Sequence, residues 1–107
     1  MTFFSCGEDS HDLAVMSVGP DALGPEANRV GMYYFASQLD TYEDLQEAHR
    51  YLMEKGANVV GTSDHGVSQS VYLTDPDGNE LEIYYERPRS EWPTEGNPFA
   101  GTTALNL

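Results

Sequence analysis

Carboxylate and apolar residues alternate from residue 80 to residue 83, and two tyrosines and Glu86 complete the segment. The alternation divides them into two sets, which are Glu80, Glu82, Tyr84 and Glu86 on one side and Leu81, Ile83 and Tyr85 on the other. Because successive side chains of a strand point to opposite faces, the segment predicts a strand with one carboxylate-rich face and one apolar face.

The five residues before this strand, 75–79, read Asp-Pro-Asp-Gly-Asn. Proline fixes φ for the second position of a turn, aspartate bonds its own backbone, and glycine and asparagine tolerate positive φ. The segment therefore predicts a chain reversal.

Glu82 occupies the face opposite Leu81 and Ile83 in this strand. If the sheet curls around a cavity, that face is the inside, and the carboxylate is a metal ligand or an acid/base group. Charged strand residues more commonly face solvent. The spacing alone leaves both interpretations open.

The remaining segments show strand-like or helix-like patterns. In chain order they are strands at 2–6 and 11–18, which form a hairpin, a strand at 31–39, a helix at 42–55, and strands at 58–62 and 67–74. Thr41 is the expected N-cap of the helix and Gly56 marks its end. From residue 31 the order is strand, helix, strand, strand, strand.

Residues 88–107 follow neither the helical nor the strand period, and they contain two prolines and two glycines after residue 92. This region is expected to be a C-terminal tail. Trp92 and Phe99 are expected to pin it to the body, because large apolar rings are rarely left in water.

Length and charge narrow the class of protein. A chain of 107 residues has room for one domain, and a net charge of −13 repels nucleic acids and anionic membranes. No apolar run reaches the roughly 18 residues needed to cross a bilayer, and no signal peptide pattern begins the chain. The single Cys6 rules out an internal disulfide and suits a reducing cytoplasm. We expect a soluble cytoplasmic protein without nucleic acid or membrane partners.

The element order, with residues 75–79 before the last strand, resembles a βαβββ module of the vicinal oxygen chelate superfamily. This superfamily includes glyoxalase, bleomycin resistance and extradiol dioxygenase proteins. Residues 5–15, 18–22 and 63–68 look like its catechol 2,3-dioxygenase branch. The resemblance implies an α+β fold in which residues 31–86 form a complete module and residues 1–18 form part of a preceding one. The domain is expected to cover residues 1–87, and the tail 88–107.

The resemblance also implies a metal site. Extradiol members bind Fe(II) through two His and one Glu, which leaves positions open for substrate and dioxygen. The Glu of that pattern falls on Glu82, but the position of one His is occupied by Tyr34, and the strand that carries the other His has no counterpart here. A phenol with an ordinary pKa of about 10 is a poor ligand for a divalent ion.

Other pocket residues also follow from the resemblance. The resemblance implies that His11 and His65 line the pocket and move protons. It also implies that Tyr72 bonds a substrate oxygen and that Tyr34 lines the substrate pocket. If a metal binds, the best remaining ligand candidates are Glu82 and His11, with His65 third. Plain structural roles stay open for the same residues: His11 could bond a turn carbonyl, His65 could cap a loop, and Tyr72 could belong to the core.

We expect a metal-dependent extradiol (catechol-type) ring-cleaving dioxygenase-like protein, with a degenerate site, that takes a small aromatic substrate and Fe(II) or another divalent metal. The alternative is a non-catalytic small-molecule-binding protein of the same fold that has lost its metal. Counting strands leaves a sheet edge and the apolar side chains of Phe3 or Phe4 uncovered. We therefore expect a homodimer, or a chain completed by a second polypeptide.

Overall fold

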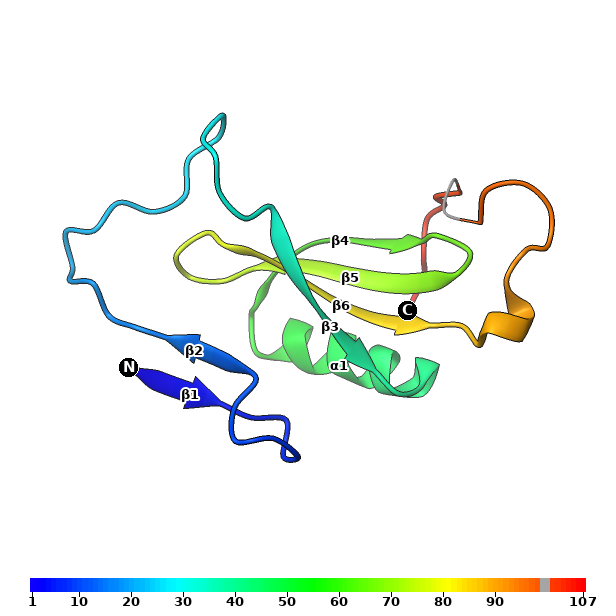
Figure 1. Cartoon of the computed structure of the whole chain (residues 1–107), viewed down its shortest axis with the longest axis horizontal. Coiled ribbons are helices and arrows are strands. Elements are labelled where there is room, and N and C mark those ends of the chain that lie inside the picture. Colours follow the sequence, from blue (N-terminus) through cyan, green and yellow to red (C-terminus); the bar gives the residue numbers. More distant parts are fainter. Residues whose placement is uncertain (99–100) are drawn as a thin grey trace.

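The body of the molecule is a four-stranded sheet with one helix packed on one face, as Figure 1 shows for a computed structural model of the chain. The structure describes residues 1–98 and 101–107. Phe99, expected to pin the tail, lies outside the described residues. The elements of the body are β3 (Tyr34–Leu39), α1 (Tyr42–Glu54), β4 (Asn58–Asp64), β5 (Ser68–Thr74) and β6 (Glu80–Glu86).

The strands of the body lie in the order β3-β6-β5-β4. Strand β5 pairs antiparallel with both β6 and β4. Strand β3 pairs parallel with β6 and is joined to β4 through α1. The βαβββ order and the α+β class predicted from the sequence are confirmed. Strand β6 therefore has a neighbour on each side, which places Glu82 between Ala36 of β3 and Tyr72 of β5.

The predicted turn forms between β5 and β6. Asp75 Oδ1 accepts bonds from the backbone N–H groups of Asp77 at 3.0 Å and Asn79 at 2.8 Å, and Oδ2 accepts from Asn79 Nδ2 at 2.9 Å. Gly78 takes φ 93°, which a side chain would oppose. Burial acts to raise the pKa of Asp75, but these bonds outweigh it and hold the pKa below the ordinary value.

Helix α1 begins and ends where the sequence predicts. Thr41 Oγ1 accepts a bond from the Asp44 N–H at 3.0 Å, and Gly56 at φ 73° ends the helix. Leu45 is fully buried against the sheet. Among the described residues, no helix is long and apolar enough to cross a membrane.

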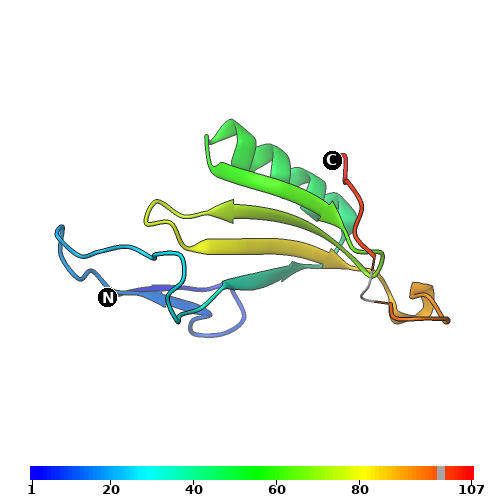
Figure 2. The same cartoon turned by 90° about the horizontal axis from the view of Figure 1, so that it is seen from above.

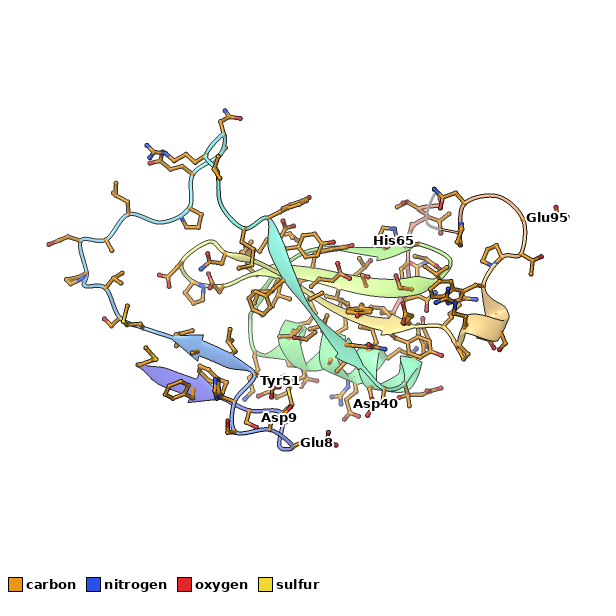
Figure 3. The ribbon with its side chains drawn as sticks, in the orientation of Figure 1. Glu8, Asp9, Asp40, Tyr51, His65 and Glu95 are labelled. Atoms are coloured by element: carbon orange, nitrogen blue, oxygen red, sulfur yellow. The ribbon has the colours of Figure 1, made fainter. Side chains whose placement is uncertain are left out.

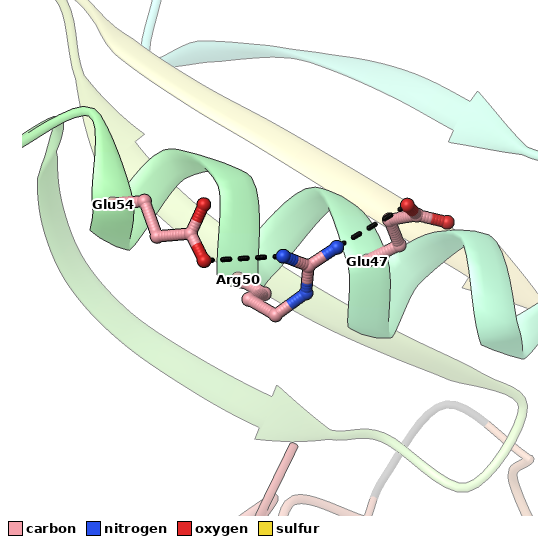
Figure 4. A network of polar contacts seen from close by, with 3 residues as sticks. All are labelled: Glu47, Arg50 and Glu54. Atoms are coloured by element: carbon pink, nitrogen blue, oxygen red, sulfur yellow. Dashed lines mark hydrogen bonds and ion pairs between the residues drawn. The ribbon is translucent and has the colours of Figure 1, made fainter.

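The outer face of α1 carries a small ionic network. Arg50 donates to Glu54 at 3.1 Å and to Glu47 at 3.3 Å (Figure 4), and all three side chains are mostly exposed. Such pairs on a wet helix face contribute only about 0.3–0.5 kcal/mol each. The helix is therefore held mainly by its apolar side, not by these charges.

The two faces of the sheet differ in what covers them. Figure 2 shows α1 lying along one side of the sheet. On this side the core is built around Leu45, Val71 and Leu73, which are at most 8% exposed. Because side chains alternate along β5 and β6, Tyr72 and Glu82 point to the opposite, open face.

The N-terminal hairpin consists of β1 (Thr2–Phe4) and β2 (Leu13–Val15). It lies away from the body, to the left in Figure 1, and across the described residues it packs against no other helix or strand. The predicted strand at 11–18 shortens to Leu13–Val15 because its partner offers only three residues. The radius of gyration is 15.9 Å, against about 13 Å for a compact chain of this length.

The C-terminal region returns to the body after a 3-10 turn, η1 (Arg89–Glu91). Trp92 Nε1 donates to the Arg87 carbonyl at 2.9 Å, and the Arg89 guanidinium lies 4.7 Å from the Trp92 ring centroid. Further on, Thr103 and Asp64 exchange backbone hydrogen bonds of 2.9 and 2.8 Å. The last residues therefore line the edge of β4.

Candidate functional site

Glu82 lies near the middle of β6, and only 8% of it is exposed. Its Oε1 accepts a hydrogen bond from Ser70 Oγ at 3.1 Å, and Ser70 itself is fully buried. A carboxylate held in this way does not belong to a solvated surface, so the solvent-facing interpretation does not apply. The carboxylate of Glu82 is therefore held among packed side chains, with the Ser70 hydroxyl as its donor.

His65 and Tyr72 meet on the same open face, near the end of the sheet where the C-terminal region returns. Figure 3 labels His65 at this end. His65 Nε2 lies 3.0 Å from the Tyr72 hydroxyl and 2.9 Å from Ser63 Oγ. The other ring nitrogen, Nδ1, lies 3.1 Å from Thr102 Oγ1. The imidazole therefore connects the tail, β4 and β5.

The protonation of Tyr72 follows from its surroundings. Partial burial raises the pKa of the Tyr72 phenol; the Ser63 hydroxyl opposes the rise, and the negative charge of Glu82 adds to it. A phenol whose pKa is above its ordinary value of about 10 keeps its proton at neutral pH. Tyr72 is therefore a hydrogen-bond donor beside Glu82.

Tyr34 lies on β3 and shares the open face, because its backbone partner is Glu80, two positions before Glu82. Its ring stands edge-on to the Tyr72 ring, with the ring centroids 6.3 Å apart, and 40% of the residue is exposed. Tyr34 and Tyr72 therefore form an aromatic wall beside the carboxylate.

His11 has a different environment. Its ring packs against Phe3 with centroids 5.1 Å apart, and its Nδ1 lies 3.0 Å from Ser10 Oγ. These partners belong to the hairpin, which is separate from the body among the described elements. Within one copy of the chain, the structure brings together Glu82, Tyr72 and His65 and leaves His11 apart.

The donor set of one chain does not fit the metal that the family resemblance implies. In residues 1–98 and 101–107, no group of three or more His, Cys, Asp or Glu side chains could hold a metal ion. Glu82 supplies one carboxylate, whereas Fe(II) in the facial arrangement takes two imidazoles as well. Tyr34 offers a phenol in place of one of them.

Three residues of this site were missed at the level of sequence. Ser70 carries a detectable signal, because it lies two positions before Tyr72 in an alternating strand and so shares its face. Ser63 could be found only from the pairing of β4 with β5. Thr102 has no local signal, since it is 37 residues from His65.

Comparison with known proteins identifies the class. The sequence model of the Glyoxalase/Bleomycin resistance protein/Dioxygenase superfamily matches residues 1–83. Because this match covers most of the chain, the chain belongs to that superfamily. The fold of the body is the module expected of such a protein, preceded by part of another.

Curated relatives point to one branch. Over 98 residues the chain is 41% identical to a catechol-2,3-dioxygenase of Bacillus subtilis (strain 168), which covers 89% of this chain and 34% of that protein. Over 84 residues it is 34% identical to biphenyl-2,3-diol 1,2-dioxygenase 2 of Rhodococcus globerulus, covering 78% of this chain and 44% of the relative. The resemblance to the catechol 2,3-dioxygenase branch is confirmed.

The chain spans less than half the length of these two relatives. Among solved structures, it is similar to a glyoxalase/bleomycin resistance protein/dioxygenase from Alicyclobacillus acidocaldarius, with a TM-score of 0.48 and 17% identity. That likeness covers 60% of this chain and 55% of the other.

Proposed function

We propose that this chain is an extradiol dioxygenase-like protein that binds a catechol-type diol on the open face of its sheet. The observation that carries the proposal is the buried carboxylate of Glu82 beside the hydrogen-bonded pair of Tyr72 and His65. The names of two relatives, a catechol dioxygenase and a biphenyl-2,3-diol dioxygenase, support an aromatic diol as the ligand.

The chemistry of the three side chains suits two neighbouring hydroxyls on an aromatic ring. A diol O–H donates to the Glu82 carboxylate, while Tyr72 donates its phenolic O–H to the second oxygen. His65, hydrogen-bonded to Tyr72 at 3.0 Å, is placed to accept or return a proton through that hydroxyl. Tyr34 and Tyr72 supply the flat apolar wall on which the ring packs.

Assembly is part of the proposal. The hairpin leaves Phe3 57% and Phe4 53% exposed, and the open face of the body carries the polar site. A second copy that covers both would stabilise the protein through about 25 cal/mol per Å² of buried apolar area. A homodimer therefore completes the site, and His11 of a second hairpin is a candidate ligand beside Glu82. A separate polypeptide could fill the same place.

One observation favours a second candidate function. Tyr34, not His, shares the open face with Glu82, so a ligand set for Fe(II) or another divalent ion is incomplete within the chain. Under this alternative the protein binds an aromatic diol without cleaving it. The two functions share the same diol-binding residues and differ only in turnover.

Catechol binding to the purified full chain tests the shared part. We expect Glu82→Gln and Tyr72→Phe each to weaken catechol binding about tenfold in calorimetry, because each removes a strong hydrogen bond to the diol. Tyr85→Phe is the matched control, since Tyr85 packs against Tyr42 on the helix-covered face. Equal catechol affinity in all four proteins would refute the proposal.

The same samples separate the two functions. With Fe(II) added under anaerobic conditions and air then admitted, an enzyme forms a coloured ring-fission product from catechol. A binding protein releases catechol unchanged. Product formation that is lost in Glu82→Gln supports the dioxygenase, and binding without product supports the alternative.

A further inference from the structure

A cavity of about 200 Å³ lies on the helix-covered side of the sheet, where α1 begins. Gln69 of β5 and Tyr85 of β6 are backbone partners, and both line it. Tyr42, the first residue of α1, stands edge-on to Tyr85 with the ring centroids 6.1 Å apart, and Leu105 of the tail adds a further wall. Glu82 points to the opposite face of the sheet, so this cavity is separate from the candidate diol site.

The amide of Gln69 is the most deeply buried polar group of this cavity. Gln69 is 2% exposed, and its Nε2 donates to Asp64 Oδ1 at 3.0 Å. From residues 1–98 and 101–107, no donor bonds its Oε1. In the same part of the chain every fully covered polar side-chain atom has a partner, so Oε1 is not fully covered and opens to the cavity that Gln69 lines. A buried acceptor of this kind indicates a bound molecule that donates to it.

Arg87 lines the same cavity, and its guanidinium is only loosely paired. Among the described residues its ion-pair partner is Asp64, whose Oδ2 lies 3.7 Å from Arg87 Nη2. That distance is too long for a hydrogen bond. Asp64 Oδ1 already accepts bonds from Gln69 and from the Gly66 N–H, the latter at 2.8 Å. Because a guanidinium carries five N–H donors, Arg87 retains donors for the carboxylate of a ligand.

The charges of the lining favour one kind of ligand. Arg87 supplies a cation, whereas Gln69 Oε1 and the exposed carboxylate of Glu91 supply acceptors. A simple anion would be repelled by Asp64 and Glu91, and a simple cation by Arg87. A zwitterion has a partner for each of its charges. Since Arg87 and Gln69 both adjoin Asp64, they lie close together, which suits the short separation of carboxylate and ammonium in an α-amino acid.

The walls and the size of the cavity define the rest of the ligand. Tyr42 and Tyr85 present aromatic rings and Leu105 an aliphatic side chain, which together suit an apolar side chain. A volume of about 200 Å³ is below the roughly 300 Å³ at which pockets for drug-sized ligands begin. The ligand is therefore small.

We propose that this cavity binds a free α-amino acid with an apolar side chain. Arg87 holds the carboxylate of the amino acid, and Gln69 Oε1 and Glu91 accept hydrogen bonds from its ammonium group. This site does not rest on the proposed diol-binding function, because the two lie on opposite faces of the sheet.

The side-chain amide of Gln69 gives a direct readout, because its oxygen accepts the ligand. L-Leucine is the probe. We expect leucine in the millimolar range to shift the Gln69 side-chain signals in ¹H–¹⁵N spectra of the labelled full chain, which are assigned by their loss in Gln69→Met. Two analogues carry one charge each: 3-methylbutylamine lacks the carboxylate and 4-methylpentanoate lacks the ammonium. Each should bind about tenfold or more weakly than leucine.

Variants of the two charged residues test the lining. Arg87→Met keeps the aliphatic stem and should weaken leucine binding about tenfold, because the carboxylate loses its cation. Arg89→Met is the matched control, since Arg89 lies 4.7 Å from the Trp92 ring centroid and does not line the cavity. Glu91→Gln changes an exposed side chain without loss of fold and should weaken leucine binding about threefold.

Three results would overturn the proposal. One is an unshifted Gln69 amide at millimolar leucine, and another is equal affinity for leucine and its two analogues. The third is a loss of affinity in Arg89→Met as large as that in Arg87→Met. If Arg87→Met does not fold, unchanged leucine affinity in Glu91→Gln decides against the site. The titrations contain no catechol, so a chain that binds leucine but not catechol retains this site and loses the proposed function.

Discussion

The body of residues 34–86 and the hairpin of residues 2–15 use similar residues with opposite results. In the body, Val71 is fully buried between two neighbouring strands and under α1. In the hairpin, Phe4 and Val15 have one partner strand and remain 53% and 47% exposed. Two short strands cannot bury an apolar face without a further layer. The two regions differ in how many strands and helices pack around each side chain, not in residue composition.

Polar groups follow the same division. Ser70 of the body is fully buried and bonded to Glu82. In the hairpin, Asp12 Oδ2 accepts from the exposed Cys6 N–H at 2.8 Å, and the charge of Asp12 raises the pKa of the Cys6 thiol. That thiol therefore stays protonated at neutral pH, which disfavours a nucleophilic role. The side chains of the candidate site therefore lie in the part of the chain that is packed.

Core truncation should show the largest contrast between the regions. Leu45→Ala removes a fully buried side chain of the body and should lower the free energy of unfolding by about 2–5 kcal/mol in urea titrations. Leu13→Ala in the hairpin, where the side chain is partly exposed, should cost less than about 0.5 kcal/mol in a dilute sample. Equal losses would show that the hairpin is packed as firmly as the body.

If a second copy covers the hairpin, truncating a hairpin side chain would cost more stability. The difference in unfolding free energy between the two regions would then be smaller. We expect light scattering behind size exclusion, at micromolar concentration, to give about twice the chain mass of 11.8 kDa. Phe4→Asp should weaken that dimer by about 2 kcal/mol, because it places a charge in an apolar contact. A single well-folded species at the chain mass would contradict the assembly.

Metal binding tests whether the body fails to hold a divalent ion only because it lacks an imidazole ligand beside Glu82. The unaltered chain should hold well under one iron per chain after dialysis, as judged by mass spectrometry of metals. Tyr34→His supplies an imidazole on the face of Glu82 and should raise affinity for a divalent metal about tenfold or more in calorimetry. Tyr33→His is the control, because Tyr33 is 78% exposed and precedes β3. Identical titrations of both variants would count against the position assigned to Tyr34.

The turn of the body should give the smallest effect and a dependence on pH. Asp75→Ala should cost about 1 kcal/mol at pH 7, because three hydrogen bonds to its carboxylate are exchanged for water. The pKa of Asp75 is lowered in the folded state, so its contribution is present above the unfolded pKa of about 3.9 and is lost as pH falls through the folded value.

Urea midpoints at pH 7 and near pH 3 check this prediction. The gap between the native chain and Asp75→Ala should narrow at the lower pH. Asp77→Ala, in the same turn with an exposed side chain, should change stability by less than about 0.5 kcal/mol at either pH. A gap that widens in acid would reverse the sign assigned to Asp75.

The sequence by itself determined the local features. The turn at residues 75–79, the two faces of β6, and the cap of α1 at Thr41 rest on φ preferences, on alternation and on bonds within a few residues. It also determined the family, because the order of elements and the motif before the last strand are written along the chain. For these features, neighbours in sequence are neighbours in space.

Only the tertiary structure decided the site. Whether Glu82 was exposed or buried depended on the strands beside it, and alternation fixes only which face it occupies. The bond between His65 and Thr102 joins residues 37 positions apart, and the separation of His11 from Glu82 reflects where the hairpin lies. Burial and long-range hydrogen bonds depend on which segments pack together, and no local pattern of residues encodes that choice.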